Sequence, residues 1–268
     1  MNRIDAVFKR LRDSGRKGLI PFITAGDPDL ETTEKAVLEI AAGGADIIEL
    51  GIPFSDPLAD GPTIQKSSLR SLTSGHTSLA GVLELVRSIR KQTGVPICFM
   101  SYYNPIFSMG EDNFFERAGQ CGVDGVIIPD LPPEEAEGVI RLGAGHDVKT
   151  VFLAAPTSPP ERLKLISECS TGFIYFVSLT GITGVRNRLS ADLEQNLEAV
   201  RAVSDKPVAV GFGISGPETA FQASQWADGV IIGSALVKIF EKYQLDGARL
   251  IREAGSFIQE IRKALDNR

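Results

Sequence analysis

A single glutamate interrupts one of the apolar runs of this sequence. Glu49 lies inside Asp46-Ile-Ile-Glu-Leu-Gly-Ile, a run typical of a strand that is buried on both faces. Two-residue alternation puts Glu49 on the same face as Ile47, so its carboxyl has apolar neighbours. Burial raises the pKa of a carboxyl, which makes Glu49 a candidate general acid or base. A structural role, in which Glu49 pairs with an Arg or with backbone groups, stays open.

Two aspartates follow in the next loop. The segment Pro53-Phe-Ser-Asp-Pro-Leu-Ala-Asp-Gly-Pro carries Asp56 and Asp60. Asp-Pro and Asp-Gly are ordinary turn dipeptides, so spacing alone is compatible with two turn-forming residues. Because this loop directly follows the strand of Glu49, it can also bring one of the two carboxylates over the same site.

Three glycine-rich segments follow the last three predicted strands. They are Thr180–Gly184, Gly211–Ser215 and Gly233–Ala235. Each is compatible with a tight turn, but together they converge on one side of a barrel mouth. Backbone N–H groups and the N-terminus of a short helix after the eighth strand favour an anion there. We therefore expect a phosphorylated substrate.

Lysine and histidine are absent from the positions that other aldolase chemistries require. Lys149 begins a predicted strand, at the wrong end for catalysis, and this disfavours a Schiff-base mechanism. Neither His76 nor His146 has a partner at metal-ligand spacing, so no metal site is predicted. The remaining mechanism is proton transfer by carboxylates, without a cofactor in this chain. Apolar residues at strand ends suit a flat substrate group, although core packing explains each equally well: Phe22, Met100, Tyr102, Tyr175 and Phe212.

The elements that would position these residues alternate along the chain. Eight apolar runs are predicted as parallel strands, namely Gly18–Thr24, Asp46–Leu50, Pro96–Met100, Asp124–Ile128, Val148–Leu153, Phe173–Val177, Pro207–Val210 and Gly229–Ile232. Amphipathic stretches between them are predicted as helices, among them Glu31–Ala42, Leu79–Gln92, Glu111–Gln120, Glu134–Leu142, Glu161–Ser167, Asp192–Val203, Glu218–Ala223 and Gly247–Leu265. The pattern predicts an α/β fold, one (β/α)8 TIM barrel domain over residues 1–268, with an N-terminal capping helix within Met1–Ser14.

Composition excludes several classes of protein. The 268 residues include 28 Lys and Arg against 34 Asp and Glu, for a net charge of -6. Such a field repels polyanions, so nucleic acid is not an expected partner. No apolar run approaches the ~20 residues of a membrane span. The three cysteines, Cys98, Cys121 and Cys169, are expected as buried small side chains in a reducing compartment, the cytoplasm.

Four segments carry a family resemblance across essentially the whole chain. The run 49–62, Glu-Leu-Gly-Ile-Pro-Phe-Ser-Asp-Pro-Leu-Ala-Asp-Gly-Pro, resembles the signature of the tryptophan synthase α subunit. The segments at 176–184, 210–214 and 232–235 are similar to segments that recur in that family in the same order. The long motif is highly specific, whereas many phosphate-binding barrels share the glycine loops.

The resemblance implies retro-aldol cleavage of indole-3-glycerol phosphate into indole and glyceraldehyde 3-phosphate. Glu49 would protonate indole C3 and handle the glycerol hydroxyl proton, while Asp60 would hold the indole N–H and stabilise its developing positive charge. The remaining substrate-binding residues implied are Phe22, Met100, Tyr102, Tyr175, Thr183, Gly184, Gly211, Phe212, Gly213, Gly233 and Ser234. Met100 stands where many relatives carry Leu, a change that similar volumes make tolerable.

The resemblance also implies a partner, the pyridoxal-phosphate (PLP) β subunit of an α2β2 heterotetramer. Apolar and proline-rich loops at the active-site face suit such an interface, and within them we expect Asp56, Pro57, Asn104, Phe107 and Pro132 to contact the partner. The same loops could instead fold inward as a lid. Two further readings stay open: a stand-alone lyase that releases free indole, and a non-catalytic subunit that binds a sugar phosphate.

Overall fold

A closed ring of parallel strands forms the centre of the molecule. The computed structural model describes residues 1–75, 77–178, 186–211 and 213–267. Its strands are β1 (Gly18–Thr24), β2 (Ile48–Gly51), β3 (Ile97–Met100), β4 (Gly125–Ile127), β5 (Lys149–Val151), β6 (Leu153–Ala154), β7 (Ile174–Val177), β8 (Val208–Gly211) and β9 (Gly229–Ile232). They pair in the order β5-β4-β3-β2-β1-β9-β8-β7-β6. The ring closes because β5 and β6 are consecutive pieces of one strand, as expected for the predicted TIM barrel.

The ends of the other predicted strands differ from the observed ones by at most two residues, whereas the fifth predicted strand is divided. Val148–Leu153 was predicted as one strand, but it is divided at Phe152 into β5, which pairs with β4, and β6, which pairs with β7. Here side-chain hydroxyls, in place of main-chain carbonyls, accept hydrogen bonds from main-chain N–H groups of the strand. The Phe152 N–H donates to Ser170 Oγ at 3.3 Å, and the Thr150 N–H donates to Thr171 Oγ1 at 2.7 Å. The strand therefore changes partner at this point.

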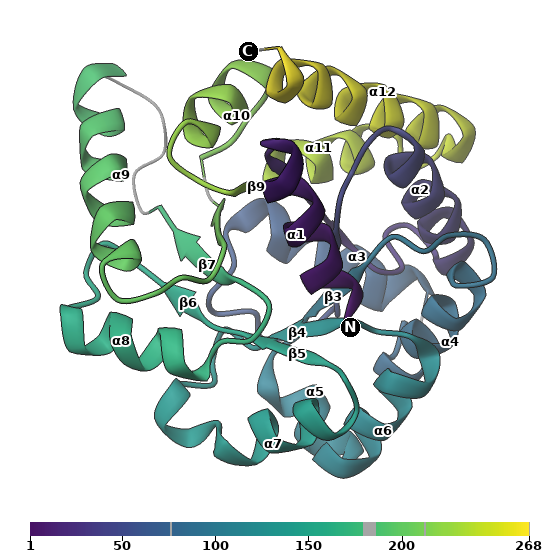
Figure 1. Ribbon diagram of the computed structural model, residues 1–268. Coiled ribbons are helices and arrows are strands. Elements are labelled where there is room, and N and C mark those ends of the chain that lie inside the picture. Colours follow the sequence, from purple (N-terminus) through teal and green to yellow (C-terminus); the bar gives the residue numbers. More distant parts are fainter. Residues whose placement is uncertain (76, 179–185, 212, 268) are drawn as a thin grey trace.

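Helices surround the ring on all sides (Figure 1). The helices that cover the ring are α2 (Leu30–Ala42), α4 (Leu79–Ile89), α6 (Glu111–Cys121), α7 (Glu137–Gly145), α8 (Pro160–Cys169), α9 (Arg186–Arg201), α10 (Pro217–Ser224) and α12 (Gly247–Asp266). Their apolar faces pack on outward side chains of the strands, such as Leu19, Ile23 and Phe99. This shell is the larger of the two hydrophobic cores.

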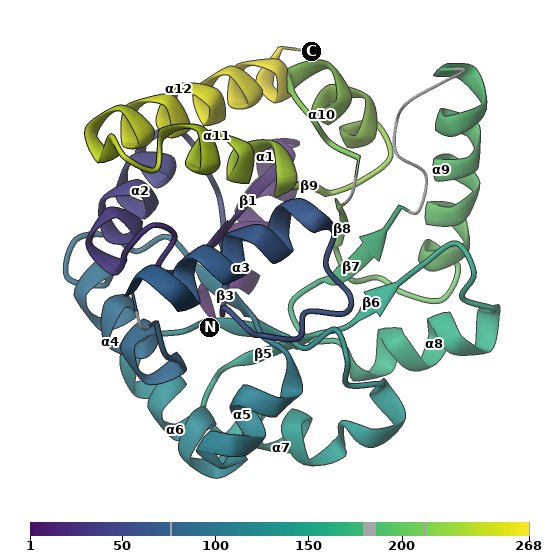
Figure 2. The same ribbon diagram turned by 180° about the vertical axis from the view of Figure 1, so that it is seen from behind.

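Additional helices lie at the end of the barrel where the strands finish. They are α3 (Pro62–Gly75), α5 (Tyr103–Met109), α11 (Ser234–Tyr243) and the 3-10 turn η1 (Pro133–Glu135), and Figure 2 shows α3 and α5 at this end. The sequence predicts a short helix after the last strand, which is α11, but no helix at α3 or α5. α3 is rich in Ser and Thr, which have low helix propensity, and α5 has only 7 residues, too few for a periodic pattern.

The N-terminal helix closes the opposite end. α1 (Arg3–Ser14) lies across that mouth in Figure 1. Its apolar side chains Ile4, Val7, Phe8 and Leu11 pack inside the ring, in a second core cluster with Phe173 and other inward residues. Burial of one such side chain stabilises the fold by roughly 1.5–3 kcal/mol. The predicted capping helix is therefore confirmed. Because it fills this end of the barrel, the lumen is open only at the end where the strands finish.

Other sequence expectations have mixed outcomes. Lys149 begins β5 and pairs with Asp5 of α1 at 2.7 Å, so it lies at the end away from the strand carboxyl termini, as predicted. Cys98 and Cys121 are buried, but Cys169 is only half-buried because it is the last residue of α8. His76 lies outside the described residues. None of the described helices is long and apolar enough to cross a membrane.

Candidate active site

Strand register brings the predicted site residues to one level of the barrel. Inward and outward side chains alternate, so Phe22 and Glu49 follow Ile20 and Ile47, both members of the inner cluster. Phe22 pairs with Glu49 in the ladder between β1 and β2, and Glu49 pairs with Cys98 of β3. The Glu49 carboxyl therefore lies in the lumen, above the apolar floor that α1 completes.

Glu49 has the environment of a proton-transfer residue. Its side chain is 1% exposed, and its Oε2 has no hydrogen-bond partner among the described residues. Burial, reinforced by the nearby charge of Asp60, raises the pKa of Glu49 to about 8. The group is therefore protonated near neutral pH, and its unbonded oxygen is available to a substrate. The structural alternative, a Glu49 held by an Arg, finds no support in the described contacts.

Asp60 is the loop aspartate that faces the lumen. The Tyr102 hydroxyl donates to Asp60 Oδ2 at 3.2 Å, and Gln65 Nε2 of α3 donates to the Asp60 main-chain oxygen at 2.9 Å. Burial raises the pKa of Asp60 to about 6, against the lowering effect of the Tyr102 hydrogen bond. Asp56, in contrast, is exposed and accepts a hydrogen bond from Ser55. The structure thus separates two aspartates that spacing alone left equivalent.

Aromatic and small residues line the walls beside the two carboxyls. Tyr175 of β7 is 4% exposed, and burial, with the charges of Glu49 and Asp60, raises the pKa of its hydroxyl. A Cβ at Gly211 would meet the Tyr175 hydroxyl at 2.4 Å. Met100, at the end of β3, is half-buried beside the inner cluster.

Sequence reasoning missed one residue of this wall, Gly51. A Cβ there would lie 2.6 Å from Phe22 Cζ, so only glycine lets the Phe22 ring lie over β2. The available signal was a glycine two positions after Glu49 within a strand. Such a glycine commonly marks a close approach.

The expected phosphate-binding segments are described in part. Gly233 directly precedes α11, whose first residue, Ser234, is exposed, so free N–H groups of this helix point toward the mouth. A Cβ at Gly233 would meet only Phe22 atoms at 3.6 Å or more, which leaves room at that point. Gly213 has a φ of 77°, a left-handed conformation that favours glycine. Thr183, Gly184 and Phe212 lie outside the described residues.

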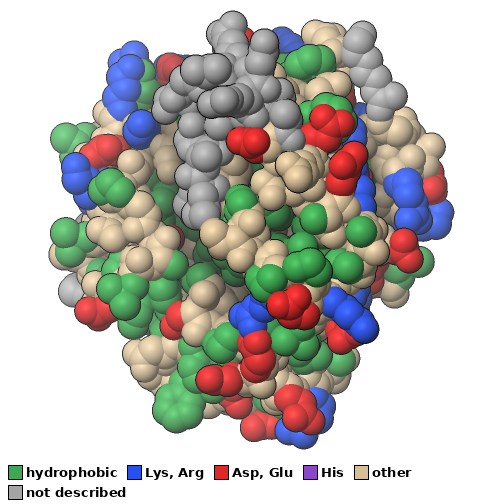
Figure 3. Space-filling view, turned by 90° about the vertical axis from the view of Figure 1, so that its left-hand side faces the viewer, with side chains coloured by type: hydrophobic (Ala, Val, Ile, Leu, Met, Phe, Trp, Pro, Cys, Tyr) green, Lys and Arg blue, Asp and Glu red, His purple; other side chains and the backbone are tan. Residues whose placement is uncertain are grey.

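The predicted interface residues lie around the same mouth. Pro57 and Pro132 are half-buried, Asp56 and Asn104 are exposed, and Phe107 of α5 is 65% exposed. Leu58, in the loop of Asp60, is 91% exposed. Figure 3 views the molecule from the side of α8 and α9, and hydrophobic side chains gather at its lower left, toward this mouth. Exposed apolar side chains gathered beside a mouth are typical of an interaction site.

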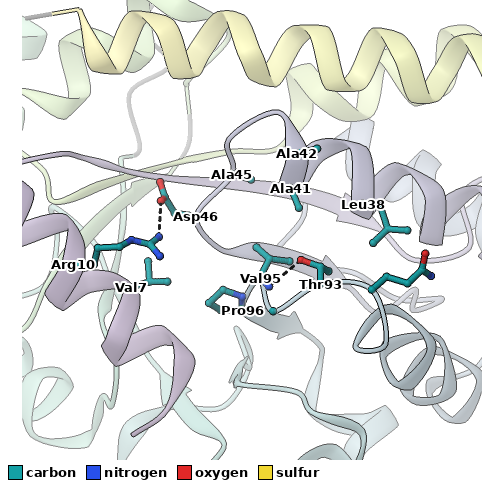
Figure 4. Close-up of a pocket in the computed structure, with 12 residues that line it drawn as sticks. Val7, Arg10, Leu38, Ala41, Ala42, Ala45, Asp46, Thr93, Val95 and Pro96 are labelled. Carbon is teal, nitrogen blue, oxygen red and sulfur yellow. Dashed lines mark hydrogen bonds and ion pairs between the residues drawn. The ribbon is translucent and has the colours of Figure 1, made fainter.

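The opposite end of the barrel carries pockets of a different kind. One of about 600 Å³ lies between α1, the end of α2 and the turn before β3, and its lining includes Val7, Ala42 and Pro96 (Figure 4). At the edge of this pocket Arg10 forms an ion pair with Asp46, so the Asp46 carboxylate already has a partner. In the part of the chain that the structure describes, no group of three or more His, Cys, Asp or Glu is arranged to hold a metal ion.

Comparison with known proteins gives one consistent result. Residues 8–266 match the family model of the tryptophan synthase alpha chain. The tryptophan synthase alpha chain of Geobacter sp. (strain M21) is 49% identical over 99% of this chain and 98% of its own length. The solved tryptophan synthase subunit alpha of Legionella pneumophila str. Paris has a TM-score of 0.91 and 40% identity, covering 100% of both chains.

A chain of the tryptophan synthase complex of Pyrococcus furiosus is also similar. Its TM-score is 0.83 at 38% identity, and the match covers 92% of this chain and 98% of that chain. Sequence and structure thus agree over nearly the full length, and the two carboxyl groups lie at the strand ends where a TIM barrel carries its active site. The chain belongs to the tryptophan synthase alpha chain family.

Proposed function

We propose that this chain cleaves indole-3-glycerol phosphate into indole and glyceraldehyde 3-phosphate. The observation that carries the proposal is the buried Glu49 carboxyl, which has an unbonded oxygen and a pKa raised to about 8, next to Asp60 at the open end of the barrel. A perturbed pair of carboxyls in an apolar lumen is typical of proton-transfer sites. The reaction needs no metal or cofactor in this chain.

Glu49 would act first as an acid and then as a base. In its neutral form it donates a proton to indole C3, and the ring nitrogen takes on positive charge. The bond between C3 and the glycerol carbon then breaks, and its electron pair returns to the ring. The glycerol hydroxyl loses its proton to the Glu49 carboxylate and becomes the aldehyde. Glu49 ends the cycle neutral, so protons balance without an external donor.

Asp60 would stabilise the charge that appears on the ring nitrogen. Its pKa of about 6 leaves it mostly ionised at neutral pH, ready to accept the indole N–H. Such a contact strengthens as positive charge develops, so it lowers the barrier more than it tightens substrate binding. The phosphate would bind at Gly213, Gly233 and the N-terminus of α11, with Phe22 and Tyr175 beside the indole.

We further propose that the partner is the PLP-dependent β subunit, which would receive the indole in an α2β2 heterotetramer. The exposed Phe107 and Leu58 beside the mouth support an interface there. A β subunit seated on the loop of Asp60 would order it and raise turnover, because a fixed loop reaches the reactive geometry more often.

The decisive experiment measures indole release by Glu49→Gln. The amide keeps size and hydrogen bonding but has no transferable proton, so turnover should fall at least ~10²-fold while substrate still binds. Glu116→Gln is the matched control and should keep full turnover, because Glu116 is exposed on α6 and its one hydrogen bond to a described side chain comes from Gln120. Near-normal indole formation by folded Glu49→Gln would sink the assignment.

Titration with a β subunit separates the remaining possibilities. Association with a rise in indole-glycerol-phosphate cleavage supports the α2β2 role. High turnover by the chain alone, with no association, would favour a stand-alone lyase. Binding of glycerol phosphate without cleavage under either condition would favour a non-catalytic subunit.

A further inference from the structure

The Tyr102 hydroxyl is bound on both sides by the loop that carries Asp60. It accepts a hydrogen bond from the Ala59 N–H at 2.8 Å and donates one to Asp60 Oδ2 at 3.2 Å. A tyrosine hydroxyl has a single proton to donate, and here that proton goes to Asp60. The hydroxyl thus has no proton left with which to bind a substrate oxygen.

The aromatic ring of Tyr102 is fixed as firmly as its hydroxyl. The side chain is 5% exposed, and its ring packs on Phe54 with centroids 5.3 Å apart. On either side, Ser101 N–H donates to Ile127 O of β4 at 3.0 Å, and Tyr103 N–H donates to Asp130 Oδ1 at 2.8 Å. Tyr102 is therefore held in place by packing and hydrogen bonds between the ends of β3 and β4.

Among the residues that the structure describes, the Asp60 loop has few other hydrogen bonds. Asp60 N–H bonds Pro57 O within the loop, and Gln65 of α3 bonds Asp60 O. Apart from its bonds to α3, the segment 53–60 makes two hydrogen bonds to other parts of the described structure. Both are made with the Tyr102 hydroxyl. Without the hydroxyl, the Asp60 carboxylate would have no hydrogen bond to any other described residue.

We propose that Tyr102 is a positioning residue, which holds Asp60 over the lumen before substrate arrives, rather than the substrate contact expected from sequence. The inference rests on the proposed function, because it assigns the order of the site to one hydroxyl. The same hydrogen bond favours the ionised form of Asp60. In the described part of the chain, the other titratable groups facing this pair are Glu49, Tyr175 and, on the Tyr102 side, Asp130.

The test is Tyr102→Phe in the full chain, assayed with a β subunit and without one. The variant keeps the ring against Phe54 and removes only the hydroxyl. We expect kcat to fall ~10-fold with KM changed less than ~3-fold, as for an interaction needed mainly in the transition state. The acid limb of the pH–rate profile should move to higher pH, since Asp60 loses a bond to its ionised form. Tyr103→Phe, which removes a hydroxyl bonded to Glu111 at 2.7 Å, is the control and should match the wild type.

A double-mutant cycle with Asp60→Asn separates positioning from general loss of structure. If Tyr102 acts through Asp60, adding Tyr102→Phe to Asp60→Asn should change kcat less than ~2-fold. An unchanged kcat and pH profile in Tyr102→Phe, or a rise in KM alone, would overturn the inference. Those results leave the proposed function intact as long as Glu49→Gln is inactive. An active Glu49→Gln would instead remove the function itself.

Discussion

Buried carboxyl groups at the two ends of the barrel differ in their hydrogen bonding. Asp46 lies just before β2 and Glu49 lies within it, three positions further on. Asp46 Oδ2 accepts hydrogen bonds from Leu19 N–H and Arg262 Nη1, each at 3.0 Å, and Arg10 lies 3.4 Å from Oδ1. Glu49 is more deeply buried, and its Oε2 has no partner in the described structure.

Asp124, at the start of the fourth strand, repeats the arrangement of Asp46. Arg90 and Ile97 N–H bind its Oδ2 at 2.6 and 2.8 Å, and Arg3 binds its Oδ1 at 2.8 Å. A buried carboxylate that is fully bound holds strands and helices together, but it has no free oxygen for chemistry. The difference indicates that the closed end is built for stability and the open end for reaction.

Removal of a bound carboxylate should have the largest effect on folding. Asp124→Ala leaves Arg90, which is 11% exposed, without its carboxylate partner and should lower the free energy of unfolding by about 3–5 kcal/mol, measured in urea. Asp13→Ala removes only an exposed ion pair with Lys9, which solvent screens, so its unfolding free energy should stay close to that of the wild type and it serves as the control. Turnover per folded molecule should be unchanged in both. Equal free energies of unfolding for Asp124→Ala and Asp13→Ala would contradict the view that the bound carboxylates of the closed end stabilise the fold.

The unbound carboxyl should show the reverse, a gain in stability on replacement. Folding holds a proton on Glu49 between the ordinary pKa of 4.5 and about 8, so stability falls as pH rises through that window. Glu49→Gln removes this loss, so its free energy of unfolding should exceed that of the wild type by about 5 kcal/mol near pH 9, with little difference near pH 4.5. Urea unfolding at both pH values measures it. A pH-independent difference would mean that Glu49 is not the titrating group.

Within the open end, the two loop aspartates should differ sharply. Asp60→Asn should lower kcat at least ~10-fold and change KM less, because its charge acts mainly in the transition state. Asp56→Asn, exposed in the same loop, should leave the chemistry of the isolated chain close to wild type. Steady-state kinetics of the pair gives the comparison, and the reverse order would show that the loop residues are wrongly assigned.

The smallest effect is expected at the phosphate side. Gly233→Ala places a methyl at ordinary contact distance from Phe22, so the fold should tolerate it. The methyl also lies where an anion would approach the backbone, and KM should rise ~3–10-fold with kcat nearly constant. Glycerol phosphate should compete with substrate in the wild type and less well in the variant. An absence of competition in the wild type would contradict the site.

Patterns of type and spacing were enough to predict the parallel strands, the capping helix and the exceptional position of Glu49. The predictions rest on alternation and apolar runs, which depend on neighbours along the chain. The division of the fifth strand at Phe152 depends on hydroxyls of Ser170 and Thr171, which lie 18 or more residues away. The contact between Tyr102 and Asp60, 42 residues apart, is of the same kind. Such pairs are set by how strands meet in space, and a single sequence carries no signal for them.

The division of the fifth strand has a consequence for cleavage of the polypeptide. Neighbouring strands elsewhere in the ring are joined by ladders of hydrogen bonds, but β5 and β6 are joined by the peptide bonds through Phe152. After a protease cut at this residue, the described hydrogen bonds of Thr150 and Phe152 with residues 170–175 would have to keep the ring closed there. If the ring opened at the cut, it would expose strand edges, which are templates for aggregation. A cut in an outer turn, such as the one after α6, would expose no new edge. Fragments divided at such a turn are therefore better suited to reassembly than fragments divided at Phe152.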